Sequence, residues 1–196
     1  MSTCLWPGNN QLMKLYHDNE WCVPSHDDAY IFEMLSLEGA QAGLSWNTVL
    51  AKREEYQKAF NNFGIEYCSK LTDEELEKIR EKYNIIKNLS KIKSVRSNAI
   101  AVISIQKEFG SFSDYLWNYV GGHPVINDWS NEGQMPAQTP LSERISKDMK
   151  KRGFKFVGAV IIYSFMQAIG MVDDHIKTCH YHSKNNNGET RNLFMR

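Results

Sequence analysis

Hydrophobic residues recur along most of this chain at the spacing of an amphipathic helix. Positions three and four apart are apolar in one stretch that holds Ile92, Val95, Ala99, Val102 and Ile103, which predicts a helix with one buried face. Thr72, followed three residues later by Glu75, predicts a capping box at the start of another helix. Asp27 and Asp28 precede the apolar positions of residues 32–37 and predict a helix N-cap there.

Further helices are predicted on the same grounds. Residues 44–60 and 141–151 have helical spacing, residues 158–168 are strongly apolar, and a short helix is expected from residue 111 to the stop signal Gly121-Gly122. Residues 123–140 hold three prolines and predict a long loop. No run shows the alternation of a strand, so the fold class predicted is all-α.

Length and composition indicate one globular domain. The chain has 196 residues, of which 42% are hydrophobic and 23% charged. We expect a domain over residues 1–182 and a polar, Asn-rich, disordered tail over residues 183–196. No apolar run approaches the length of a membrane span, and the N-terminus lacks the pattern of a signal peptide. Four cysteines without an export signal predict reduced thiols and a cytoplasmic protein.

The net charge is zero, yet basic residues cluster. Six lysines and arginines lie between residues 144 and 155, and a second basic group comprises Lys87, Lys91, Lys93 and Arg96. Such clusters can present a basic face to phosphates. The alternative is that both are ordinary solvated helix surfaces.

The segment between the last two predicted helices is a candidate phosphate-binding hairpin. Gly153 and Gly158 allow backbone N–H groups to approach an anion, Arg152 and Lys155 add charge, and the next helix would add its positive N-terminal end. Such contacts would position DNA without reading its sequence. An ordinary helix–turn–helix corner would give the same pattern.

Aromatic residues and one carboxylate form a second candidate site. Tyr16, Trp6, Trp21 and Trp46 fall in the first 46 residues, and Glu38 lies in a stretch of small, uncharged residues. Aromatic faces stack flat heterocycles and attract cations, and a buried carboxylate accepts hydrogen bonds. Together they suit a flat cationic ligand. The alternative is that the aromatics are core and Glu38 is exposed.

Four potential metal ligands lie near the two ends of the chain. Cys4, His17, His175 and Cys179 would form a closed tetrahedral set for a structural Zn²⁺ that joins the termini. Four cysteines and six histidines could also produce such a quartet by chance, and His180 and His182 are possible substitutes.

Several segments together resemble the DNA-3-methyladenine glycosylase I family of the helix-hairpin-helix glycosylase superfamily. The matching stretches span residues 16–21, 37–46, 150–158 and 163–168, with Asp174 and His175, and the similarity runs from about residue 4 to residue 179. The resemblance implies an all-α, helix-hairpin-helix domain. It also implies a DNA repair enzyme that flips out a nucleotide and hydrolyses the N-glycosidic bond to 3-methyladenine in alkylated duplex DNA.

The resemblance also assigns roles to residues. Glu38 would recognise the base and act in catalysis within a pocket formed by Tyr16, Trp46, Trp21 and Trp6. Gly43 and Leu44 would enter the duplex where the base has left. The zinc quartet named above would be structural. No lysine in these segments can be placed as a Schiff-base nucleophile, so we expect a monofunctional enzyme, a monomer that releases free 3-methyladenine.

Three positions depart from the family pattern. Met13 replaces a pocket tyrosine of many members, Cys22 replaces a usual glycine, and Asp173 replaces an asparagine of some relatives. Met13 and Cys22 keep open an alternative, a catalytically weak or inactive DNA-binding relative. In other glycosylases of the superfamily, an aspartate at the place of Asp173 stabilises the sugar cation.

Overall fold

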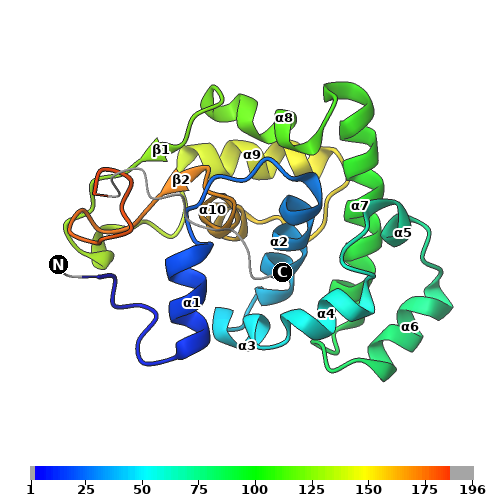
Figure 1. Cartoon of the computed structure of the whole chain (residues 1–196). Helices are drawn as coiled ribbons and strands as arrows, with labels where there is room; N and C mark the ends of the chain where they lie inside the picture. The colour runs from blue at the N-terminus through cyan, green and yellow to red at the C-terminus, as the bar shows by residue number, and fades with distance from the viewer. Residues whose placement is uncertain (1–2, 186–196) are drawn as a thin grey trace.

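A computed structural model describes residues 3–185, and these residues fold mainly into helices (Figure 1). The predicted all-α class is confirmed apart from a two-stranded sheet. The elements, in chain order, are α1 (Gln11–Asn19), α2 (Asp28–Gln41), α3 (Trp46–Leu50), α4 (Arg53–Ala59), α5 (Ile65–Ser69), α6 (Asp73–Lys82), α7 (Leu89–Phe109), α8 (Phe112–Trp117), η1 (Asn118–Val120), β1 (Val125–Ile126), η2 (Glu132–Gln134), α9 (Pro140–Lys151), α10 (Ala159–Ala168) and β2 (Val172–Asp173).

The helix α2 forms the centre of the fold. Its N-cap Asp27 accepts hydrogen bonds from the backbone N–H groups of Ala29 and Tyr30, as predicted. Every residue from 30 to 40 is buried, because α2 packs against α3, α7, α8 and α10. A helix enclosed in this way gives a rigid support for any side chain that it carries.

Other start signals are also confirmed. Thr72 and Glu75 form the capping box of α6, and Ser111 caps α8. The predicted helix over residues 44–60 is wrong in one respect: it is broken between Leu50 and Arg53 into α3 and α4. At the break, Lys52 Nζ donates to the side chain of Asn84 (2.7 Å), which ties the start of α4 to the end of α6.

The expected loop over residues 123–140 contains two short elements. Strand β1 pairs in parallel with β2, with Val125 opposite Val172, and η2 lies further along. The sheet went unpredicted because two-residue strands have no readable alternation. Glu132 of η2 accepts hydrogen bonds from the backbone N–H groups of Leu5 and Trp6, so the N-terminal segment is fixed against this loop.

The chain that follows β2 returns to the N-terminal segment (Figure 1). Thr3 Oγ1 lies 3.7 Å from Cys179 Sγ. The first residues of the expected tail are bound to the domain, since Ser183 donates to Asp173 and Lys184 pairs with Asp128. The rest of that tail, residues 186–196, lies outside the described residues.

The second basic group is engaged within the fold. Lys93 and Arg96 both pair with Asp73 (2.7 and 2.6 Å), and Lys87 donates to backbone carbonyls at the end of α6. These cations therefore join α6 to α7. Among the described helices, none has the length and apolar character needed to cross a bilayer.

Candidate active site

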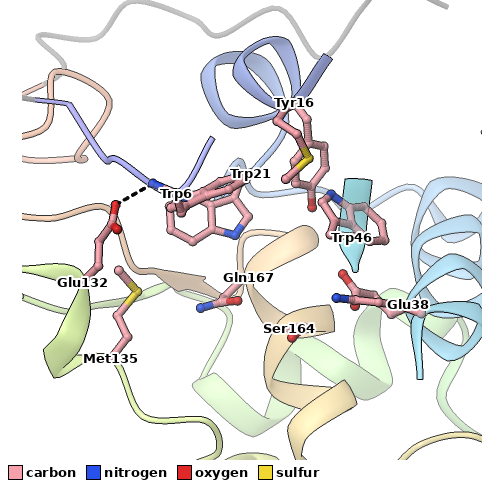
Figure 2. A pocket seen from close by; sticks show the side chains of 11 residues that line it. Trp6, Tyr16, Trp21, Glu38, Trp46, Glu132, Met135, Ser164 and Gln167 are labelled. Carbon is pink, nitrogen blue, oxygen red and sulfur yellow. Dashed lines mark hydrogen bonds between the residues drawn. The ribbon is translucent and has the colours of Figure 1, made fainter. Parts of the chain in front are cut away.

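A cavity of about 320 Å³ opens beside α2 (Figure 2). Side chains reach it from α1, α2, α3, α10, the segments before and after α1, and the loop around η2. The lining residues are Trp6, Met13, Tyr16, Trp21, Glu38, Gln41, Trp46, Glu132, Met135, Ser164 and Gln167. All five residues that the sequence placed in a base pocket are thus brought together.

Aromatic rings form two walls of the cavity. Trp6 and Trp21 meet edge to face, with ring centroids 5.1 Å apart, and Tyr16 and Trp46 lie 5.2 Å apart at 53°. Figure 2 shows the two pairs on neighbouring sides of the same space. This geometry offers flat faces to a planar ligand.

Glu38 is the buried carboxylate of the cavity. Its side chain is 3% exposed, so the alternative of a surface residue is wrong. Burial raises the pKa of Glu38 from 4.5 to about 8, because water no longer solvates the charge. In the described part of the chain, Glu38 Oε2 has no hydrogen-bond partner, and neither do the indole N–H groups of Trp6 and Trp46. Buried polar atoms normally have partners, so three unpaired atoms around one cavity indicate a ligand site.

Several lining residues were missed from the sequence. Gln41 lies one turn beyond Glu38 on α2, and Ser164 and Gln167 lie one turn apart on α10. Helical spacing from Glu38 could have suggested Gln41. Glu132 and Met135 come from the long loop, whose path no sequence pattern shows.

Asp174 supports this cavity from behind. Its buried carboxylate accepts hydrogen bonds from Asn127, Trp129, Tyr163 and Gln167, all between 2.6 and 2.7 Å. The Gln167 amide is therefore oriented by a fully hydrogen-bonded carboxylate. Asp174 was seen in the sequence only as part of a matching motif.

The three residues that depart from the family pattern lie in different parts of the structure. Met13 lines the cavity. Cys22 adopts φ +61°, a conformation that favours glycine, and its buried sulfur accepts a hydrogen bond from the Asp174 N–H (3.3 Å). Asp173 does not line the cavity, and its carboxylate binds the Nδ1 of His175 (2.8 Å) and the backbone of Ser183.

The four expected metal ligands are buried near one another. Ligand atoms of Cys4, His17 and Cys179 lie within 4.8 Å of one another. The His175 ring is 4.8 Å from the His17 ring, but His175 belongs to a second cluster with Cys22 and Asp173. Carboxylates hold Nδ1 of both histidines, so Nε2 is the nitrogen that a metal would take, as in many metal-binding histidines.

His180 and His182 do not join the first cluster. The Nε2 of His182 lies 3.0 Å from the Asn127 carbonyl oxygen, and neither histidine belongs to the groups of potential ligands found in the described residues. The donor set of two thiols and two imidazoles suits Zn²⁺.

The predicted hairpin joins α9 to α10. Gly153 has φ +93°, whereas Gly158 has φ −63° and is the N-cap of α10 without a side-chain cap. Open space surrounds the Cβ position of both glycines. The Asn98 amide exchanges two hydrogen bonds with the backbone of Lys155, which fixes the hairpin on α7.

Arg152 differs from the freely exposed cation that the sequence suggests. Its guanidinium pairs with Glu108 (2.6 Å) and Asp148 (2.9 Å) and lies over the rings of Phe109 and Tyr115. A phosphate contact would compete with these carboxylates, so the DNA-binding role of Arg152 stays a prediction.

Gly43 and Leu44 lie between α2 and α3. Gly43 has φ +78°, and the Leu44 side chain is 42% exposed. In the chain, this exposed apolar side chain lies between two residues that line the cavity, Gln41 and Trp46.

The architecture is that of the 3-methyladenine DNA glycosylases. A crystal structure of a 3-methyladenine DNA glycosylase I superposes with a TM-score of 0.89 at 44% identity and covers 92% of this chain and 100% of its own. The structure that describes 3-methyladenine recognition by the Staphylococcus aureus enzyme gives a TM-score of 0.90 at 33% identity, over 93% and 97% of the two chains.

Sequence comparison gives the family directly. The methyladenine glycosylase family model matches residues 6–182. The chain is 41% identical to DNA-3-methyladenine glycosylase 1 of Escherichia coli (strain K12), over 91% of this chain and 96% of that protein. It is 39% identical to the Haemophilus influenzae DNA-3-methyladenine glycosylase, over 90% and 95%. The chain belongs to the methyladenine glycosylase family.

Proposed function

We propose that this protein hydrolyses the N-glycosidic bond of 3-methyladenine in alkylated duplex DNA and leaves an abasic site. One observation carries the proposal: three unpartnered polar atoms, Glu38 Oε2 and the indole N–H groups of Trp6 and Trp46, surround one aromatic cavity. A purine that is flipped out of the helix presents both donors and acceptors at its edge. The three unpartnered atoms of the cavity can pair with such groups.

The cavity favours a cationic base over a neutral one. Methylation at N3 places positive charge on adenine, so the base leaves as a neutral molecule and its bond to the sugar is already weakened. Aromatic faces add roughly 0.5–2 kcal/mol for a cation, and a charged hydrogen bond adds about 1.5–3 kcal/mol. Since about 1.4 kcal/mol corresponds to a factor of ten, the two contacts can separate damaged from normal adenine by two orders of magnitude.

Glu38 changes its protonation state in this account. In the free protein its pKa of about 8 keeps the carboxyl neutral at pH 7. A cationic base in the same cavity would favour the carboxylate, so binding releases a proton. Glu38 then accepts a hydrogen bond and complements the charge of the base.

We assign DNA contacts to two exposed segments. Leu44, next to Gly43, would enter the space that the flipped base leaves, and the backbone of Gly153 and Gly158 would bind phosphate with the positive end of α10. Lys155 is exposed on this hairpin and adds a cation, and Arg152 would join only by leaving its carboxylates. The helix-hairpin-helix assignment rests on this α9–α10 geometry.

We propose a structural Zn²⁺ held by Cys4, His17, His175 and Cys179. A closed set of four protein ligands leaves no position for substrate, so the ion would stabilise the fold and supply no chemistry. The buried cluster and the carboxylate on Nδ1 of each histidine support this proposal.

Three broader expectations belong to the same proposal. We infer that residues 1–182 form the functional domain, that the protein acts as a monomer, and that it works in the cytoplasm. No lysine is among the described residues that line the cavity, which supports a monofunctional enzyme that does not cut the strand.

The test is base release from methylated DNA, followed by chromatography. We expect 3-methyladenine to be released by the wild-type protein and lost with Glu38→Gln. The matched control is Glu81→Gln, an exposed position on α6, which should keep wild-type activity. No release by the wild type, or equal release by both variants, would refute the assignment. Borohydride trapping of an enzyme–DNA adduct would refute the monofunctional mechanism.

A further inference from the structure

Lys91 is a buried lysine outside the cavity. It lies in the first turn of α7, is 8% exposed, and donates from Nζ to the carbonyl oxygens of Ala40 (2.8 Å) and Ala42 (2.6 Å). These carbonyls belong to the C-terminal end of α2, where a cation is favoured by the helix dipole and the open carbonyl groups. In the sequence, Lys91 looked like one member of a solvated basic group.

The segment held by Lys91 connects two walls of the cavity. The helix α2 ends at Gln41, and Ala42, Gly43 and Leu44 lead to α3 and Trp46. Gly43 lies in the left-handed region, with φ +78°, and nothing lies within 4 Å of its Cβ position. The local bond from the Ala42 N–H to the Gly39 carbonyl is long, at 3.4 Å. The Lys91 ammonium therefore fixes the backbone directly before the flexible glycine and the exposed Leu44.

We propose that Lys91 is a positioning residue that holds Leu44 in the orientation required to enter the duplex, by bonding the carbonyls on the helix side of Gly43. This inference rests on the proposed function, because it presumes that Leu44 fills the space of a flipped base. Lys91 itself touches neither base nor DNA. A local hydrogen bond from the Leu44 N–H to the Gln41 carbonyl (2.6 Å) also spans Gly43. Without the Lys91 ammonium this single bond would orient Leu44, and the insertion step would slow.

The experiment compares Lys91→Met with Lys93→Met. Both variants remove an ammonium from the same helix, but the half-buried Lys93 pairs with Asp73, far along the chain from α2. We expect Lys91→Met to reduce the single-turnover rate of 3-methyladenine release from methylated duplex DNA at least tenfold. Its affinity for free 3-methyladenine, followed by tryptophan fluorescence, should stay within twofold. Lys93→Met should keep both quantities within twofold.

A double-mutant cycle with Leu44→Ala separates positioning from general destabilisation. If Lys91 acts through Leu44, Lys91→Met should change the rate less than twofold in the Leu44→Ala background. An equal loss in both backgrounds, or parallel loss of free-base affinity, would overturn the inference. If Lys91→Met does not fold, Lys91→Arg replaces it in the same cycle, and the coupling between Lys91→Arg and Leu44→Ala decides the outcome.

Base release by the wild type distinguishes a failure of the proposed function from a failure of the Lys91 inference. A wild-type protein that releases no 3-methyladenine refutes the proposed function and this inference with it. A wild type that is active, with Lys91→Met equal to Lys93→Met, refutes the inference alone.

Discussion

Replacing Glu38 by glutamine should stabilise the protein relative to the wild type by an amount that grows as the pH rises, although we expect it to impair base binding. The substitution keeps the shape of the side chain and removes its ionisation. In the folded protein the pKa of Glu38 is about 8, whereas its ordinary value is 4.5. The folded state therefore retains a proton that the unfolded chain releases, so this group lowers stability as the pH rises through this interval.

The magnitude follows from the two pKa values. The cost is absent below pH 4.5, reaches about 3 kcal/mol at pH 7, and levels off near roughly 5 kcal/mol above pH 8. For a chain of this size, about 3 kcal/mol corresponds to a shift in melting temperature of roughly 6–12 °C. The buried amide of glutamine adds a cost of its own, but that cost does not vary with pH.

Thermal denaturation of both proteins from pH 5 to pH 8.5 measures the effect. The difference in melting temperature isolates Glu38, because all other titrating groups are shared. We expect the difference to shift in favour of Glu38→Gln with rising pH. A permanently cationic adenine, methylated at N3 and N9, should bind the wild type with an affinity that increases as the pH rises over the same interval. Its affinity for the variant should not depend on pH. A difference in melting temperature that is constant over this range would refute the reasoning.

Four further predictions concern other parts of the fold. Gly158→Asp should cap α10 and leave the melting temperature unchanged or higher, yet weaken DNA binding relative to the isosteric Gly158→Asn, measured by anisotropy with duplex DNA. Cys22→Gly should be more stable than Cys22→Ala by about 1–2 kcal/mol, because only glycine tolerates φ +61° there without strain; denaturant titration decides. Trp46→Ala should weaken binding of free 3-methyladenine by about 1–3 kcal/mol, as fluorescence titration would show, because a stacking face is lost. Metal analysis should find one Zn²⁺ per chain, and removal by a chelator should lower the melting temperature.

The sequence predicted those elements whose signals are local. Capping residues such as Asp27, Thr72 and Ser111 form their bonds within one helical turn, so the starts of α2, α6 and α8 could be read directly. The break between α3 and α4 could not, since no Gly or Pro marks it. There the chain turns at Lys52, whose partner Asn84 is remote in sequence.

The residues of the candidate site fall into the same two groups, those with a local sequence signal and those placed by contacts with remote residues. Glu38 and the aromatic residues stood out because a lone carboxylate among small residues, and several tryptophans in a short stretch, are unusual compositions. Glu132 lines the cavity and its carboxylate binds the N-terminal backbone, a contact between residues more than a hundred positions apart. Lys91 was misread for the opposite reason: the cations next to it in the sequence stay partly or fully exposed, whereas the packing of α7 on α2 buries Lys91.

The cavity and the cluster of potential metal ligands share a wall, which would connect the stability of the termini to base binding if the proposed ion is bound. Trp6 is two residues from Cys4, and the Trp21 ring lies 5.7 Å from the His17 ring and 4.7 Å from the His175 ring. An ion that fixes these ligands would also fix the two indoles that face the base. The wall formed by Trp6 and Trp21 would then owe its rigidity to contacts between the two ends of the chain, and not to helix α1 alone. A structural ion remote from the chemistry would therefore act on affinity by holding the aromatic faces in place before the base arrives.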